Sequence, residues 1–147
     1  MERARDPEEW RQAEKAWYAN TQEEARQLFA RAIERVSVQW DGLPASFYLT
    51  QWAYLEATAQ ERERFEVLYE KAFALEPDAP LHKLSYARVL WTEFKDAAAC
   101  ARAIEQLESL LKSARWRPEG DLALRAYEQK IETLRAWIRG EPGGLWP

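Results

Sequence analysis

Few residues in this chain could carry covalent chemistry. The 147-residue sequence holds one cysteine, Cys100, and one histidine, His82. A thiol and an imidazole act as nucleophile and base when they lie within hydrogen-bond reach. Here the two residues fall on different predicted helices, and no third residue that could orient the imidazole is identifiable. Because Cys100 lies in a run of alanines, we expect a buried, unreactive thiol, and we expect His82 to be exposed in a first helical turn.

The acidic residues form no recognisable catalytic pair. A hydrolytic pair needs two carboxyl groups that face each other across a cleft, whereas most acidic residues here stand beside Arg or Lys, which is typical of a solvated helix face. Glu56 and Glu66 are flanked by aromatic residues, so we expect structural hydrogen bonds for them. One Cys and one His make a Cys/His zinc site almost impossible, and the five glycines form no phosphate-binding loop. We therefore predict a protein that is not an enzyme and uses no cofactor or metal.

Composition and charge indicate a globular protein with its own core. Hydrophobic residues make up 47% and charged residues 31% of the chain. The formal net charge of −4 argues against a dedicated nucleic-acid binder, which needs a basic face. The N-terminal residues lack the apolar core of a signal peptide, and no stretch reaches the ~20 apolar residues of a membrane span. We expect a cytoplasmic protein with no membrane partner.

The elements that must position any site are helices. Prolines and glycines cluster at a few points, and between them apolar residues recur with the helical period. Thr21 and Glu24 have the spacing of a capping box, while Asn20 suits the left-handed position that ends a helix. Gly140 stops the last helix. The predicted helices span 7–19, 21–37, 44–58, 61–75, 79–94, 97–114 and 119–139.

The helices repeat in pairs. The second, fourth and sixth share one apolar stripe, with spacing i, i+4, i+7, i+8 on a single helical face. The stripes start at residues 25, 65 and 103, so they are offset by 40 residues (25 to 65) and then by 38 (65 to 103). In the preceding helices, small residues recur where two helices must approach closely, at Ala13, Ala53 and Ala87. A helix-pair repeat of about this period is typical of an α-solenoid.

Three segments carry a family resemblance. The run 69–77, Tyr-Glu-Lys-Ala-Phe-Ala-Leu-Glu-Pro, is similar to the end of a tetratricopeptide repeat (TPR), in which an aromatic residue, a small residue and a terminal proline recur at this spacing. The runs 25–33 and 52–56 resemble its variant, the half-a-TPR repeat, at least as well. This chain departs from the pattern at Phe65, which replaces the usual small residue.

The resemblance implies an all-α superhelix, a TPR-like α-solenoid of about three helix pairs plus a C-terminal capping helix. The repeats would occupy about residues 6–37, 46–77 and 80–115, and the capping helix 119–139. Residues 1–139 would then form one domain, with 140–147 as a C-terminal tail.

The resemblance also implies a binding surface, because in this family the first helix of each unit lines a concave face. Carried over residue by residue, that geometry gives an aromatic groove for a peptide or helix of another protein. Arg88 is the only cation among the matching positions, so the family's clamp for a C-terminal carboxylate is not implied. The alternative is that helix 119–139 fills the groove. The implied partner-binding residues are Trp10, Trp17, Tyr18, Phe47, Tyr54, Leu84, Arg88 and Trp91.

The leading hypothesis is therefore a protein–protein interaction adaptor or scaffold. A self-associating structural module, such as a homodimer, is the first alternative, because solenoid ends and aromatic tails mediate homodimers. An RNA-associated repeat protein is the second, because Arg and Trp alternate in 115–117 and 135–139 as they do in stacking platforms. The tail ends in Leu145 and Trp146, and we expect both to pack weakly on this chain or on a neighbour.

Overall fold

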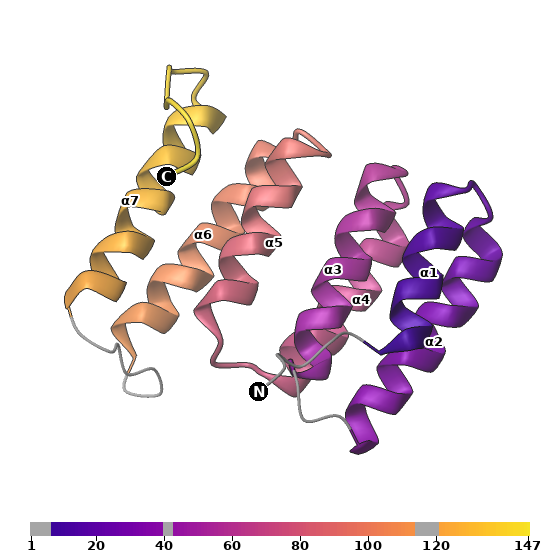
Figure 1. The fold of residues 1–147 in the computed structure, drawn as a ribbon. Helices are drawn as coiled ribbons and strands as arrows, with labels where there is room; N and C mark the ends of the chain where they lie inside the picture. Colours follow the sequence, from indigo (N-terminus) through magenta and orange to yellow (C-terminus); the bar gives the residue numbers. More distant parts are fainter. Residues whose placement is uncertain (1–6, 40–42, 114–120) are drawn as a thin grey trace.

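The structure, a computed structural model, describes residues 7–39, 43–113 and 121–147. These residues form seven helices and no strand, as the sequence predicts (Figure 1). Each helix begins and ends within a few residues of its predicted bounds. The helices are α1 (Glu8–Tyr18), α2 (Gln22–Gln39), α3 (Ala45–Thr58), α4 (Arg62–Leu75), α5 (Pro80–Thr92), α6 (Ala97–Lys112) and α7 (Asp121–Ile138).

Consecutive helices pack as pairs. α1 lies against α2, α3 against α4, and α5 against α6, and these are the most extensive contacts between helices. The three pairs stand side by side in chain order, and α7 follows the third pair at the end of the row (Figure 1). Between pairs, the second helix of one contacts the first helix of the next, and α5 contacts both α3 and α7.

The first helix of every pair ends at a residue in the left-handed conformation. Asn20, Gln60 and Lys95 take φ angles of 65°, 60° and 52° after α1, α3 and α5. Gly140, with φ 74°, ends α7 in the same way. Such a residue turns the chain and lets the following N–H groups reach the carbonyls of the last helical turn. The predictions for Asn20 and Gly140 are confirmed, and α7 ends as a first helix does.

The turn after α5 is wider than the others. The N–H of Glu61 donates to the Glu56 carbonyl after α3, and the N–H of Glu141 donates to the Ala136 carbonyl after α7. After α5, the N–H of Asp96 instead donates to the Leu90 carbonyl. This hydrogen bond reaches back six residues along the chain, whereas the other two reach back five. The turn between α5 and α6 therefore holds four residues, 93–96, where the turns within the first two pairs hold three.

Helix starts follow local chemistry. Pro80 is the first residue of α5, where its missing N–H leaves no hydrogen bond unmade. Asp96 caps α6, since its carboxylate accepts from the Ala99 N–H at 3.0 Å. The Thr21 hydroxyl, predicted to cap α2, donates to the Ala16 carbonyl at 2.7 Å and so ties the turn to the end of α1.

The core consists of two clusters of buried side chains. One joins α1 and α2 to α3 and is rich in aromatic rings, and the other runs from α3 to α7. The alanines that repeat in the sequence are completely buried, as close helix contacts require. Those alanines are Ala13, Ala53 and Ala87. The burial that the sequence predicts for these three positions is therefore confirmed.

Candidate functional site

A hollow of about 410 Å³ lies between α3 and α5, the first helices of the second and third pairs. Tyr54 from α3 is 44% exposed, and Arg88 from α5 is also exposed. The two occupy equivalent positions, because each directly follows one of the repeated buried alanines, Ala53 and Ala87. The remaining lining is mostly polar. It consists of Thr50, Gln51, Tyr69, Ser85, Val89, Thr92 and Glu93.

Tyr69 from α4 closes the floor of this hollow. Its hydroxyl shares a hydrogen bond of 2.8 Å with the Ser85 hydroxyl, which in turn donates to the His82 carbonyl at 3.1 Å. Burial raises the pKa of Tyr69 to about 12, so the phenol stays neutral near pH 7. The floor therefore offers hydrogen-bonding groups without charge, and Arg88 and Glu93 supply the charges of the lining.

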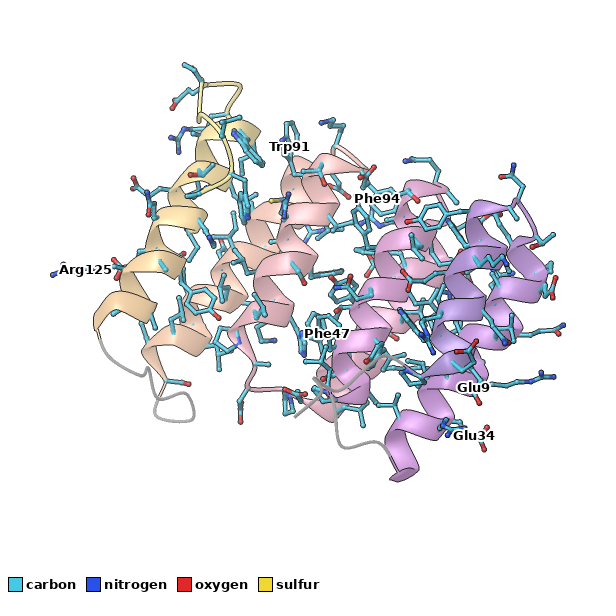
Figure 2. The ribbon with its side chains drawn as sticks, viewed as in Figure 1. Glu9, Glu34, Phe47, Trp91, Phe94 and Arg125 are labelled. Atoms are coloured by element: carbon cyan, nitrogen blue, oxygen red, sulfur yellow. The ribbon has the colours of Figure 1, made fainter. Side chains whose placement is uncertain are left out.

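Five of the eight predicted partner-binding residues have side chains that are at least partly exposed to solvent. Tyr54 and Arg88 line the hollow, whereas Tyr18, which is 71% exposed at the end of α1, lies outside it. Phe47 near the start of α3 and Trp91 near the end of α5 are both half-buried (Figure 2). The structure therefore brings together only two of these five around one hollow.

The other three are core residues, which corrects their assignment to a partner surface. Trp10, Trp17 and Leu84 are 4%, 6% and 2% exposed. The Trp10 ring lies 4.7 Å from the ring of Phe29 and 4.9 Å from that of Tyr48, measured between centroids. Large rings at these positions fill the space between α1, α2 and α3. Their side chains are not available to a partner.

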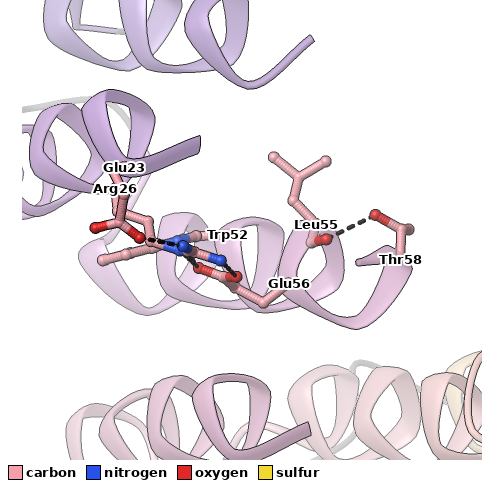
Figure 3. Close-up of polar contacts among 6 residues, drawn as sticks. All are labelled: Glu23, Arg26, Trp52, Leu55, Glu56 and Thr58. Carbon is pink, nitrogen blue, oxygen red and sulfur yellow. Dashed lines mark hydrogen bonds and ion pairs between the residues drawn. The ribbon is translucent and has the colours of Figure 1, made fainter. Parts of the chain in front are cut away.

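Polar networks join the first pair of helices to the second (Figure 3). Glu56 of α3 is completely buried and accepts three hydrogen bonds. Two come from Arg26 of α2, from Nε at 2.9 Å and Nη2 at 2.8 Å, and one comes from Trp52 Nε1 at 3.0 Å. The bond to Glu56 raises the pKa of Arg26, so the guanidinium stays protonated. The expected structural role of Glu56 is confirmed.

A second network joins the second pair to the third. Arg62 of α4 donates to Glu66 at 2.9 Å and to Asp96, the cap of α6, at 3.2 Å. The Tyr86 hydroxyl of α5 donates to the other oxygen of Glu66 at 2.5 Å. Glu66 is thus satisfied by hydrogen bonds, as the sequence predicts. Burial and this hydrogen bond raise the pKa of Tyr86.

Three more polar side chains meet where α3 and α5 begin and α4 ends. The buried Ser46 hydroxyl donates to Glu76, whose other oxygen lies 3.9 Å from Nε2 of His82. The imidazole is buried rather than exposed, which corrects the prediction, and burial lowers the pKa of His82 although Glu76 opposes the shift. The serine contacts the carboxylate and not the imidazole, so the three do not form the relay of a serine nucleophile.

Cys100 lies at the start of α6 in the larger core cluster and is completely buried, as predicted. Burial raises the pKa of its thiol to about 11, so little thiolate forms near pH 7. His82 belongs to the cluster at the other end of α5. No nucleophile–base pair is formed between the two residues. Among the described residues, no three metal-ligating side chains gather.

The tail folds back onto α7 and reaches α5. The Trp146 ring lies 4.7 Å from the Arg88 guanidinium carbon and 5.5 Å from Lys130 Nζ, measured to the ring centroid. It also packs against Trp137 of α7 at 5.6 Å between centroids. Leu145, expected to pack with Trp146, is instead 93% exposed. Of the two tail residues expected to pack, Trp146 therefore docks on the chain and Leu145 does not.

The sequence interpretation placed Thr50 on the groove but missed Lys130 and most of the polar lining of the hollow. Lys130 and Trp137 are separated by seven residues on one helix, which places them on the same face of α7. That spacing, next to a tail ending in an aromatic residue, is the signal that could have indicated the contact. The hydroxyl group of Ser85 carries no comparable signal.

The Arg-Trp pattern proposed for RNA stacking is used within the chain where the structure describes it. Arg135 donates two hydrogen bonds to Glu108 of α6, and Arg139 pairs with Glu141 at 3.0 Å. Trp137 packs against Trp146. The segment 115–117 lies outside the described residues.

Comparison of the chain with protein-family models, curated proteins and solved structures finds no match. None of the described helices is both long and apolar enough to cross a membrane.

Proposed function

We propose that this chain is a TPR-like α-solenoid that acts as a non-enzymatic cytoplasmic adaptor and binds a segment of another protein in the hollow between α3 and α5. The observation that carries the proposal is the pair Tyr54 and Arg88. Two exposed side chains at equivalent positions of successive units face one hollow, as the binding residues of repeat proteins do.

The architecture supports this proposal. Successive pairs lie in chain order, each first helix ends in a left-handed residue, and one fully buried alanine recurs in each of the three first helices. α7 ends like a first helix and its outward residues, such as Arg125 and Glu128, are exposed and polar. A polar outer face is what a capping helix of a repeat array requires.

The chemistry of the hollow suggests the kind of segment. Tyr54 offers an aromatic face, Arg88 offers a cation, and the hydroxyl groups between them offer hydrogen bonds. A short peptide with an acidic side chain next to an apolar one would satisfy both exposed residues. A completely apolar helix would leave the polar lining without partners.

Selection from a displayed random-peptide library tests the proposal with the full chain as bait. We expect the wild-type protein to enrich acidic–apolar peptides, Tyr54→Ala to lose them, and Arg88→Glu to reject the acidic position while remaining folded. Tyr18→Ala is the matched control, because Tyr18 is an exposed tyrosine outside the hollow. A wild-type selection with no common motif, or one that Tyr54→Ala leaves unchanged, would contradict the proposal.

A second candidate is self-association, and one observation favours it. Leu43, Leu75 and Leu81 are about half-exposed and lie where α3 begins, α4 ends and α5 begins. Exposed leucines at the termini of neighbouring helices are typical of an interface between copies. Light scattering of the eluted protein decides this. A monomer at high micromolar concentration would remove the candidate, and a dimer that Leu81→Glu dissociates would support it.

A further inference from the structure

The tail, defined here as residues 141–147, contacts the rest of the chain at several points along its length. The Trp137 indole N–H donates to the Gly144 carbonyl at 3.3 Å, and the Lys130 amine donates to the Pro147 carbonyl at 2.5 Å. Between these two bonds the Trp146 ring is placed over cations from two helices, Arg88 of α5 and Lys130 of α7. The contacts come from elements that are far apart in the sequence.

The glycines of the tail fit this path and no other residue would fit as well. A Cβ atom on Gly143 would lie 2.5 Å from Cδ1 and 2.7 Å from Nε1 of Trp137, which is closer than atoms can approach. Gly144 takes a φ of +72°, a conformation that costs other residues energy. The tail passes directly over the Trp137 ring, and its sequence permits that close approach.

The surface beneath the tail has the chemistry of a site for an aromatic ring. Two cations lie over the face of the Trp146 ring and a second indole flanks it at an interplanar angle of 41°. Cations and aromatic side chains around one ring favour tryptophan over aliphatic residues, because the attraction depends on the ring's quadrupole. Leu145, the apolar neighbour of Trp146, does not pack on this surface and is exposed.

We propose that the seam between α5 and α7, formed by Arg88, Lys130 and Trp137, is a tryptophan-binding site. The tail occupies it within the chain, and a tryptophan-containing segment of a partner protein displaces the tail. The tail is joined to α7 by a few residues, so its effective concentration at the seam is in the millimolar range. A partner segment must therefore bind better than the tail, or binding at a second surface must first weaken the hold on the tail.

That second surface is the hollow between α3 and α5, and in this respect the inference rests on the proposed function. Arg88 belongs to both sites: it lines the hollow and lies 4.7 Å from the Trp146 ring. A partner segment that binds the Arg88 side chain in the hollow draws it away from the Trp146 ring, so the tail loses one of the two cations that hold it. Docking of the tail and binding of a partner are then mutually exclusive at Arg88.

Titration with a synthetic peptide of the tail sequence, Glu-Pro-Gly-Gly-Leu-Trp-Pro, tests the proposal. The full chain carrying Trp146→Ala is labelled with ¹⁵N, and the indole N–H signal of Trp137 is followed by NMR. We expect saturable shifts in this variant, and about tenfold more peptide is needed for the same shift in the wild-type chain, where the tail competes. A peptide with alanine in place of tryptophan serves as the control and should cause no shift.

The seam residues are tested in the same background. Arg88→Gln together with Lys130→Gln, added to Trp146→Ala, should abolish the shift, whereas Arg125→Gln, a change at an exposed residue elsewhere on α7, should not. Equal affinity of wild type and Trp146→Ala, or binding that survives loss of both cations, would overturn the proposal. Tyr54→Ala separates the two sites: it should abolish selection of peptides by the hollow and leave binding of the tail peptide intact.

Discussion

The Glu56 carboxylate of α3 accepts two hydrogen bonds from one edge of the Arg26 guanidinium of α2, at 2.9 Å from Nε and 2.8 Å from Nη2. The carboxylate side chain is 1% exposed and the guanidinium 12%. Together they form the polar link between the first two helix pairs. A buried ion pair is costly to form, but removing one partner leaves the other charge without compensation.

Glu56→Gln should therefore destabilise the protein by about 3–5 kcal/mol. All three groups that contact this carboxylate are donors, from Arg26 and Trp52, so the amide nitrogen of glutamine must face one of them. Urea unfolding followed by circular dichroism measures the effect. Glu23→Gln is the matched control, because Glu23 binds the same arginine but is 78% exposed, and its loss should cost less than about 1 kcal/mol. Similar losses for both variants would show that burial of the pair is not what matters.

Ala53→Leu should lower the free energy of unfolding by about 1–3 kcal/mol, because overpacking forces side chains and backbone apart. Ala53 is completely buried in the larger core cluster, in the register shared by Ala13 and Ala87. Differential scanning calorimetry measures the change in Tm. Ala126→Leu, at an exposed position of α7, is the control and should leave Tm nearly unchanged. An unchanged Tm for Ala53→Leu would contradict the repeat register.

The sequence predicts those features of the fold that depend on interactions between residues close together in the chain. The helices are predictable because proline, glycine and apolar periodicity act within a few residues, and the alanine register is predictable because close contacts demand small side chains. Burial of Trp10, Trp17 and Leu84 depends on how each helix rotates against its neighbours. The resemblance predicts a concave face, but it does not determine which tryptophan turns inward.

The candidate sites show the same division. Tyr54 and Arg88 are predictable from their equivalent places in two units. Lys130 requires knowing that α7 lies against α5 and that the tail turns back, and the sequence determines neither contact. The prediction for His82 is wrong for a similar reason: a first helical turn is normally exposed, but this one begins beside the start of α3 and the end of α4, where Glu76 lies 3.9 Å from the imidazole.

The protein should lose stability on mild acidification because of His82. Burial lowers the folded-state pKa of this imidazole below its ordinary value of 6.5. As the pH falls, the unfolded chain therefore takes up a proton before the folded chain does. The contribution of His82 to the free energy of unfolding is complete above about pH 7 and is lost as the pH drops from 6.5 toward the folded-state pKa. Glu76 reduces the effect without reversing it.

Urea unfolding between pH 7.5 and pH 5.5 measures this dependence, above the range where most carboxyl groups titrate. His82 is the only histidine in the sequence, so His82→Gln should flatten the profile in this window. A wild-type profile that is already flat, or a slope retained by His82→Gln, would show that burial of this imidazole does not control the pH dependence.

Gly143→Ala should release the tail without unfolding the helices. An alanine Cβ at this position would overlap the Trp137 ring, at 2.5 Å from Cδ1, and movement of that ring would break its contact with Trp146 and its hydrogen bond to Gly144. The docked tail orders only a few residues, and the entropy of ordering them nearly offsets burial of one indole. Global stability should therefore fall by only about 1.4 kcal/mol, the equivalent of the tenfold competition by the tail, while the mobility of residues 141–147 increases.

Heteronuclear NOE measurements on ¹⁵N-labelled protein detect that change. In the wild-type chain the amides of Gly144 and Trp146 should be nearly as rigid as those of α7, and in Gly143→Ala they should show the low values of a free chain end. Leu145→Ala is the control, because Leu145 is adjacent to the docked indole but 93% exposed, and it should leave the tail as rigid as before. If Gly143→Ala keeps a rigid tail, the glycine is not needed for docking; if the wild-type tail is already mobile, the seam between α5 and α7 is open and the tail does not compete for it.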